Sequence, residues 1–530
     1  MSIIISRRLP LKRSGNRGQI LLPTTAINYA MKSRRASFSL RGLMLRTQND
    51  NQMFAYTLLT IFFVSLIIAP LTAAAGADAT AAVQRKGELP DWLKLDGETR
   101  ARFETMDGQF RANGSGGDQL LALRTLLRAQ VQIPSSAAQD NHTPAFSLGI
   151  ELQDSRTYLG DDGTPLSSSY ANPMDVLQLY ARADNLPSLI DADATSHLTL
   201  GRQTVSIGSK RQIERVSYAN VIKSYTGAHW ISQSQQGHQL HAIYLVPVDR
   251  RPSRQAALFD NELAADKEQW QRRIWGLHFI KQDILPKKLS NLQGEAFIYG
   301  LEEDDSQRVQ TPDRSYVSMG FRLFRPAEIQ QWDLDLEAAY RSGTRYASTN
   351  PSDTDSLKVH ARMLLAVLGY TFDAAWQPRL SLEYYYASGD DDPNDNKFDQ
   401  YERLFGGRRT DLNNTSIHGP LTPANLSAPG FRLRVKPNDR LDGWFQYHAA
   451  SLASARDRWV IAKRRDPLGQ SGKFIGHTLD ARLRYWLLPQ RARLEVGASA
   501  LLAGDFIRRA PDKPEAEDIY FGYVQATLYF

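Results

Sequence analysis

Residues 93–104 read LKLDGETRARFE, and the two sets of alternate residues differ in character. Every second residue from Lys94 to Glu104 is charged, whereas the residues between them are mostly apolar or small. Because successive side chains of a β-strand point to opposite faces, this segment predicts a strand with one charged face and one largely apolar face.

The same alternation returns along the rest of the chain. Residues 332–341, WDLDLEAAYR, repeat it, and eighteen such segments follow one another between residue 93 and the end of the sequence. The last segment, FGYVQATLYF, has an apolar face that ends in Phe530, an ending typical of outer-membrane barrels. Aromatic residues gather at strand ends, for example at 384–386 and 485–486, where they suit the aromatic girdles of such barrels.

Composition excludes several other classes of protein. The 530 residues have a mean hydropathy of −0.42, too low for a bundle of membrane-spanning helices. There is no Cys, so disulfide scaffolds, thiolate metal sites and cysteine nucleophiles are excluded. The net charge of +7 belongs to residues 1–77, which hold ten basic residues and one acid, and the remainder carries −2. A nucleic-acid partner therefore loses its main support.

The leader and the body form separate parts of the chain. Residues 54–69, FAYTLLTIFFVSLIIA, are short of a spanning helix, and the small-residue stretch 71–82 follows them. We expect residues 1–77 to be a leader with a signal peptide cleaved between 75 and 80, and an uncleaved N-terminal anchor is the alternative. The true start is expected at Met31 or Met44. Residues 78–90 would form a short periplasmic segment, and residues 91–530 the barrel.

The connections between the predicted strands alternate in length. Residues 373–378, 437–440 and 489–490 are short, whereas 247–269, 388–429 and 454–476 are long. An outer-membrane barrel has this asymmetry, with short turns in the periplasm and long loops outside the cell. The predicted fold is therefore all-β: a single transmembrane antiparallel β-barrel of about 18 strands.

Two stretches resemble the alginate export porin family of outer-membrane channels. Residues 201–230, GRQTVSIGSKRQIERVSYANVIKSYTGAHW, are similar to the family's strand–loop–strand with Gly-Arg-Gln and a loop arginine. Lys223 and Thr226 stand where the family tends to have Arg and Asp. Residues 384–421 are similar to its Ser-Gly-Asp loop followed by Phe-Asp and Phe-Gly. The resemblance covers about residues 90–530.

The resemblance implies an eighteen-stranded barrel that exports an anionic uronate polymer past lumenal Arg and Lys. Carried over by position, Arg202, Arg211 and Lys223 are the best-matched basic residues. One departure concerns a long periplasmic turn that helps to close the pore in the family. The matching turn here, residues 488–491, is minimal.

The alternation also assigns side chains to the lumen, because the apolar face of each strand would meet lipid. Arginine suits a carboxylated solute, since its planar guanidinium pairs two-to-two with a carboxylate. For any single arginine, pairing with an acid across the wall is the alternative reading. With the residues from the resemblance, the basic candidates are Arg100, Arg102, Arg124, Arg128, Arg202, Arg211, Lys223, Arg362, Arg379, Arg432, Arg434, Arg482 and Arg484. The acidic candidates are Glu98, Glu151, Asp335 and Glu383.

The long connection 388–429 is the expected site of any gate, because turns of a few residues cannot reach across a wide lumen. Four aspartates between 390 and 395 precede Arg403, Arg408 and Arg409, so the basic block could fold inward. A solvated loop that only shields the rim is the alternative.

We therefore predict a bacterial outer-membrane channel, not an enzyme, that passes an anionic alginate-like polysaccharide. A general or uptake porin for small organic anions is one alternative, and an outer-membrane barrel lipase or protease is another. No G-x-S-x-G, H-E-x-x-H or Walker pattern occurs, and no cofactor or metal is expected. Expected partners are outer-membrane lipid, lipopolysaccharide, the transported anion and periplasmic export components.

Overall fold

The computed structural model describes residues 89–133, 145–161, 163–188, 190, 194–285, 290–305 and 309–530. The expected leader at 1–77 and its cleavage site lie outside these residues. No helix among the described residues is long and apolar enough to cross a membrane.

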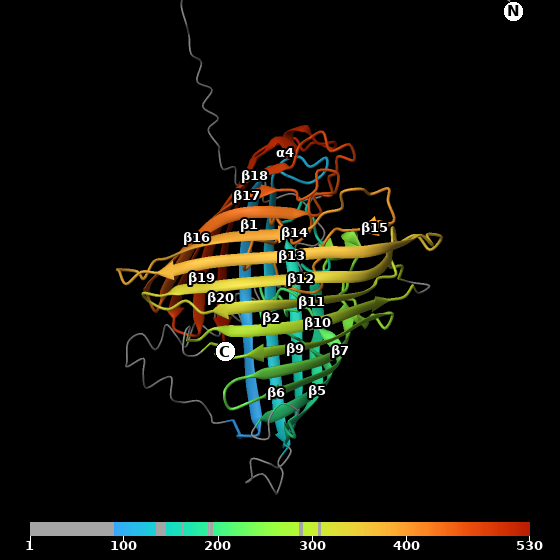
Figure 1. Ribbon diagram of the computed structural model, residues 1–530. Coiled ribbons are helices and arrows are strands. Elements are labelled where there is room, and N and C mark those ends of the chain that lie inside the picture. The colour runs from blue at the N-terminus through green and yellow to red at the C-terminus, as the bar shows by residue number, and fades with distance from the viewer. Residues whose placement is uncertain are drawn as a thin grey trace, which may run out of the picture. The chain divides into compact units, whose positions relative to one another are not determined.

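The described residues form one large sheet whose strands follow chain order (Figure 1). The first nine long strands are β1 (Leu93–Asp107), β2 (Asp118–Ile133), β3 (Ala145–Tyr158), β4 (Asn172–Leu186), β5 (Thr195–Gln203), β6 (Tyr225–Gln233), β7 (Gln239–Asp249), β9 (Arg272–Lys281) and β10 (Gln293–Glu303). The other nine are β11 (Ser315–Arg325), β12 (Trp332–Tyr346), β13 (Ser356–Thr371), β14 (Arg379–Ala387), β16 (Leu426–Asn438), β17 (Leu441–Ser451), β18 (Phe474–Leu488), β19 (Ala492–Ala503) and β20 (Ile519–Tyr529).

The sheet closes on itself because β1 pairs antiparallel with β20, from Glu98 opposite Tyr529 to Asp107 opposite Tyr520. Two short strands, β8 (Lys267–Glu268) and β15 (Lys397–Phe398), pair with β7 and β13 and are not counted among the wall strands. The described residues thus form an antiparallel barrel with eighteen wall strands, as predicted.

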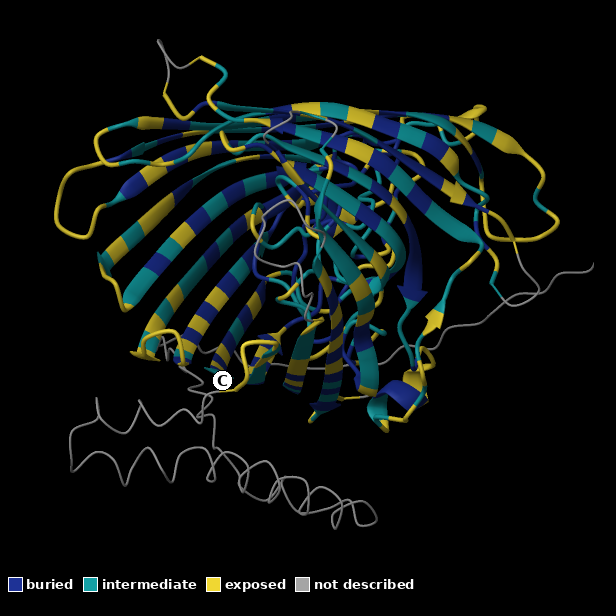
Figure 2. Cartoon of the chain, turned by 90° about the horizontal axis from the view of Figure 1, so that it is seen from below, coloured by how far each residue is buried: buried dark blue, intermediate teal, exposed yellow. Residues whose placement is uncertain are grey.

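Burial alternates along the strands, as the banded colouring of Figure 2 shows. On β20, Tyr520 and Val524 are more than half exposed, whereas Phe521 and Tyr523 between them are buried. Since each strand is paired on both edges, its exposed apolar side chains lie on the outer face of the barrel. The residues between them point into the lumen.

The two ends of the barrel differ. At one end, which we call the short-turn end, β16–β17 and β18–β19 are joined by residues 439–440 and 489–491. At the other, the long-loop end, the connections include 204–224, 250–271, 388–425 and 452–473. Two short helices, α3 (Gln255–Phe259) and α4 (Asp505–Arg509), lie in connections of this end. The predicted asymmetry of turns and loops is confirmed, including the minimal turn after β18.

Candidate functional site

Two of the long connections fold into the barrel. We call residues 204–224, between β5 and β6, the first inner loop, and residues 388–425, between β14 and β16, the second inner loop. Three arginines on the inner face of β1 and β2 hold the first inner loop by its backbone. Arg100 donates to the carbonyl oxygens of Ser217, Tyr218 and Ala219 at 3.0–3.2 Å. Arg124 donates to the carbonyl of Ala219 at 2.6 Å.

Arg102 completes this set by donating to the Tyr218 carbonyl at 2.9 Å and to Ser416 Oγ of the second inner loop at 3.3 Å. These wall arginines are buried, and Arg102 and Arg124 also pair with Glu104 and Glu98. Part of the basic lining predicted from the alternation therefore positions a loop and does not face open solvent.

Arg211, in the first inner loop, ties three elements together. Its guanidinium pairs with Asp335 at 2.7 Å and Glu337 at 2.7 Å on β12, and with Asp411 of the second inner loop at 2.9 Å. Burial opposes the charge, but the Asp411, Glu337 and Asp335 carboxylates raise the pKa of Arg211 well above its ordinary value. Arg211 is thus neutralised in place and is not among the residues of the main cavity described below.

The backbones of the two inner loops also approach closely. The amides of Phe405 and Gly407 donate to the carbonyls of Gln212 and Lys210 at 2.9 and 3.0 Å. A Cβ atom on Gly406 would lie 1.8 Å from the Arg211 carbonyl oxygen. The Phe-Gly pair singled out in the sequence therefore has a physical role, because only glycine permits this contact.

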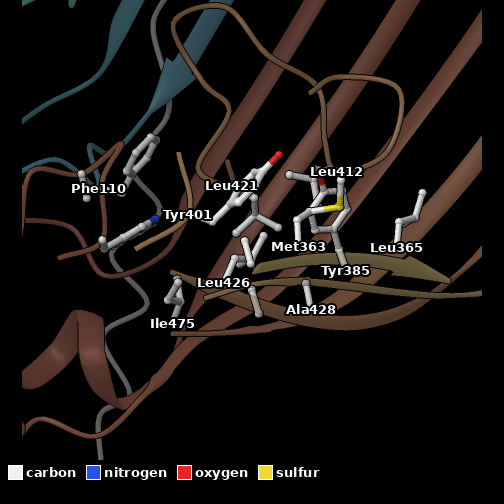
Figure 3. Packing of buried hydrophobic residues seen from close by; sticks show 14 of the residues in the cluster. Phe110, Met363, Leu365, Tyr385, Tyr401, Leu412, Leu421, Leu426, Ala428 and Ile475 are labelled. Atoms are coloured by element: carbon white, nitrogen blue, oxygen red, sulfur yellow. The ribbon is translucent and has the colours of Figure 1, made fainter. Parts of the chain in front are cut away.

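The second inner loop packs on an apolar patch of the lumen wall (Figure 3). Met363, Leu365 and Tyr385 on β13 and β14 are at most 2% exposed and contact the cluster that includes Tyr401 and Leu412 of the loop. Burying a leucine-sized side chain contributes about 1.5–3 kcal/mol. The second inner loop is therefore packed against the inner wall and is not a solvated rim loop.

Between the inner loops and the wall lies a cavity of about 740 Å³. Among the described residues, its lining carries two acids, Glu214 and Asp442. Its eleven basic residues are Arg102, Lys223, Arg250, Arg403, Arg408, Arg409, Arg432, Arg434, Lys436, Arg482 and Arg484.

Several of these cations have an acid partner, but five do not. Arg482 and Arg484 share Asp442, and Arg409 pairs with Glu495. By contrast, the described residues place no carboxylate within ion-pair distance of the five that we call the unpaired cations: Lys223, Arg250, Arg403, Arg408 and Arg434.

The unpaired cations of the loops affect one another. Lys223 Nζ donates to the Phe405 carbonyl at 2.8 Å. Burial, with Arg403 and Arg250 nearby, holds the pKa of Lys223 well below its ordinary value. Burial and Arg403 likewise lower the pKa of Arg408. An anion in the cavity would relieve this mutual repulsion, so the arrangement favours anion binding.

The cavity draws residues from both ends of the barrel. Ser169, Tyr170 and Arg250 belong to connections at the long-loop end. Gln377 lies in the 372–378 turn, and Lys436 near the end of β16, at the short-turn end. The lining of this cavity therefore includes residues from connections at both ends of the barrel.

A second cavity of about 510 Å³ lies against β1–β6 and has mixed charge. It contains Glu98 and Glu151, together with Arg128 and Arg215. Arg128 pairs with Asp96 at 2.7 Å and Arg215 with Glu151 at 2.6 Å. This wall is internally neutralised, as expected for a hydrated lumen without a strong charge preference.

The remaining predicted acids are also paired. Asp335 contacts Arg211 and Arg322, and Glu383 pairs with Arg432 at 3.2 Å. Arg379 donates to Asp333 at 2.8 Å from the inner face of β14. At these positions the alternative interpretation holds: the arginine pairs with an acid of the barrel wall.

Two predicted lumen residues lie on the opposite face. Arg202 is cross-strand to Leu179 and Thr226, and Leu179 is 59% exposed on the outer face. Its guanidinium pairs with Glu268 at 2.8 Å and with Asp175 at 3.6 Å. The lumenal placement of Arg202 is therefore wrong, because at the long-loop end the outer face has left the apolar band and carries its own ion pairs.

Arg362 is exposed and shares its face of β13 with Leu364 and Leu368, which point outward. The inner face of this strand carries Met363 and Leu365, because the second inner loop packs on it. Both faces of this strand therefore carry apolar side chains, so alternation does not identify the inner one, and the lumenal placement of Arg362 is also wrong.

Sequence reasoning missed other basic residues of the lumen. The sequence marks Arg403, Arg408 and Arg409 as a basic block that could fold inward, but Arg250 is not among the sequence candidates. Arg322, which pairs with Glu295 and Asp335, could have been found from the alternation, since it lies on the same face of β11 as Ser318 and Gly320.

A comparison of the sequence with models of known protein families shows which family the chain belongs to. The profile described as Alginate export matches residues 91–520. The chain belongs to the alginate export family. It is accordingly a porin-like channel of the bacterial outer membrane, with the short turns in the periplasm and the long loops outside the cell. None of the curated proteins matches this sequence.

Solved porins share the fold of this alginate export family member. OccK2 (OpdF) of Pseudomonas aeruginosa, in complex with glucuronate, has a TM-score of 0.52 at 12% identity, over 84% of this chain and 99% of that one. A BenF-like porin of Pseudomonas fluorescens Pf-5 has a TM-score of 0.53 at 11% identity, over 83% and 99%. OpdK of Pseudomonas aeruginosa, with vanillate, has a TM-score of 0.51 at 11% identity, over 84% and 100%.

Proposed function

We propose that this channel passes an anionic polysaccharide of the uronate class, alginate-like in its regularly spaced carboxylates, through the cavity that carries the unpaired cations. One observation carries the proposal: among the described residues, Lys223, Arg250, Arg403, Arg408 and Arg434 lack acid partners, yet they gather on one cavity with residues from both ends of the barrel. Cations that line a water-filled pore favour anions.

The chemistry of the lining suits carboxylates in series. Four of the five unpaired cations are arginines, whose planar donors fit a carboxylate bidentately. Spread along a path, such groups let a polymer exchange one carboxylate contact for the next, so that binding stays weak enough for release. The OccK2 porin, which shares the fold, is in complex with glucuronate, a single uronate.

A second candidate is uptake of small organic anions. The two inner loops that Arg100, Arg124 and Arg211 hold in the lumen favour it, because they narrow the path to a cavity of about 740 Å³. OpdK, another porin of this fold, has been solved with the small anion vanillate. Periplasmic export components belong only to the polymer proposal.

Planar-bilayer recordings of the purified protein test the proposal. In a KCl gradient the wild-type channel should prefer chloride, and Lys223→Glu with Arg434→Glu should move the reversal potential toward cation preference. Arg508→Glu is the matched control, because Arg508 is half exposed at the long-loop end and is absent from the cavity. An unchanged reversal potential in the double variant would contradict the assignment of the path.

The solute class is tested by block of the chloride current. Oligouronates of about eight residues should block at much lower concentration than glucuronate, because several carboxylates engage several cations at once. The double variant should weaken this block by about tenfold or more. A neutral oligosaccharide of equal length is the size control. Equal block by monomer and oligomer would favour the small-anion porin instead.

A further inference from the structure

The outer face of β13 carries an unusual set of residues near its long-loop end. Lys358, His360 and Arg362 occupy alternate positions, on the same face as Leu364, Ala366 and Leu368. Lys358 and Arg362 are exposed, and among the described residues neither side chain has an ion pair. The guanidinium of Arg362 also has no hydrogen-bond partner among these residues.

An apolar groove of about 940 Å³ lies beside Arg362 on the outer surface of β7 and β9–β14. Its floor includes Ala296 and Ala338, and larger side chains flank it. Of these, Leu277 is 51% exposed, and Met319 and Phe321 are each 49% exposed. Small residues between larger ones on the outer wall leave a hollow lined almost entirely by apolar side chains.

Arg362 marks one end of this groove. It lines the groove and lies cross-strand to Tyr340. The Tyr340 hydroxyl forms a hydrogen bond of 2.9 Å with Nδ1 of His360. Along β12 the outer face is apolar from Trp332 to Ala338 and becomes polar after Tyr340. Arg362 therefore lies at the outer boundary of the apolar band, where tyrosines face the lipid headgroups.

Arg362 has no acid partner among the described residues, and its position fits the headgroup level of the outer leaflet, where lipid phosphates lie within reach. The apolar groove suits an acyl chain, and the cations suit a phosphate. We propose that this surface binds the lipid A part of lipopolysaccharide, with acyl chains in the groove and a phosphate on Arg362 and Lys358. This site is independent of the lumen and of the proposed transport function.

Binding of defined lipids to the full-length protein in neutral detergent tests the proposal. Native mass spectrometry would titrate the channel with diphosphorylated lipid A, dephosphorylated lipid A, phosphatidylglycerol and inorganic phosphate. We expect lipid A to bind more tightly than the other three. Arg362→Gln should weaken its binding by about tenfold, the loss expected for a charge-assisted hydrogen bond.

A second variant isolates the groove. Ala338→Phe fills the floor without changing charge and should also weaken lipid A binding. Lys281→Gln is the matched control, since Lys281 is an exposed cation on the outer face of β9 at the short-turn end. Chloride conductance should be equal in all three variants, which confirms correct folding and separates this test from that of transport.

The proposal would be overturned by equal affinity of wild type and Arg362→Gln for lipid A. Equal binding of phosphorylated and dephosphorylated lipid A, or equally tight binding of phosphatidylglycerol, would overturn it as well.

Discussion

Replacing Arg211 by glutamine should loosen both inner loops without unfolding the barrel. In the wild type, the Arg211 side chain is 7% exposed and pairs with Asp335, Glu337 and Asp411. The substitution removes the positive charge and leaves a side chain that cannot reach all three carboxylates. The eighteen wall strands have no backbone hydrogen bond at risk, so the effect should fall on the loops.

The magnitude follows from the partners that the three carboxylates retain. Asp335 keeps Arg322 at 2.7 Å, but Glu337 has Arg322 only at 4.0 Å, and Asp411 has no second ion pair among the described residues. Removing one member of a buried pair costs about 3–5 kcal/mol. Taking the lower value, the ratio of docked to undocked loop should fall by roughly a hundredfold.

Hydrogen exchange followed by mass spectrometry measures this ratio directly. The reporters are the amides of Phe405 and Gly407, which donate to the first inner loop. Their exchange should be roughly a hundredfold faster in Arg211→Gln, and single-channel conductance should rise with larger current noise. The added change Asp411→Asn removes the uncompensated charge and should restore part of the protection.

Arg508→Gln is the control, because its exposed ion pair with Glu517 is worth at most about 1 kcal/mol. If Arg211→Gln left both the exchange of Phe405 and Gly407 and the conductance at the wild-type values, the reasoning that Arg211 fixes the inner loops would be refuted.

Three further outcomes are expected. Burial and two arginines lower the pKa of Lys223, so this side chain should lose its charge at a pH below the ordinary lysine pKa of 10.5. As pH rises, the chloride selectivity of the wild type should therefore start to decrease before pH 10.5, whereas Lys223→Arg should keep its selectivity. Identical pH profiles of the reversal potential in the two proteins would contradict this. Gly406→Ala should separate the inner loops and raise conductance, and an unchanged conductance would show that the close approach is dispensable. Burial and Asp457 raise the pKa of Asp390 to about 6, so its docked form binds a proton that the undocked form releases. Protection of the second inner loop should therefore increase as pH falls toward 4 and should depend less on pH in Asp390→Asn; equal pH dependence in both proteins would argue against this linkage.

The sequence was sufficient for the barrel because its evidence is periodic and repeated. Alternation such as that of residues 93–104 recurs in eighteen segments, and the lengths of the connections fix which end carries the loops. An error in the bounds of one strand does not change the predicted number of strands, and the family resemblance points to the same architecture.

The lumen was harder to predict because its inner face is not uniformly polar. On β13 the apolar side chains of Met363 and Leu365 point inward to meet the second inner loop, which reverses the expected face of Arg362. No local pattern reports that a loop far along the chain covers a strand. Arg202 was misplaced because alternation alone does not locate the edge of the lipid-facing band.

Alternation also could not separate cations that are free from those that are paired. Arg100 and Arg434 both lie on inner faces, yet Arg100 donates to loop carbonyls and Arg434 has no acid partner among the described residues. That distinction depends on where two loops of 21 and 38 residues fold, and only the three-dimensional structure shows it.

The most direct test of the transport path is thiol labelling at Arg434, which is exposed on the inner face of β16 and lines the main cavity. The sequence contains no cysteine, so Arg434→Cys gives a single reactive site, and Arg508→Cys serves as the control outside the cavity. If the cavity with the unpaired cations conducts anions, a negatively charged methanethiosulfonate should react with Arg434→Cys faster than a positively charged reagent of similar size. The reaction should also lower the single-channel conductance irreversibly. Unchanged conductance after complete labelling of Arg434→Cys would contradict the account.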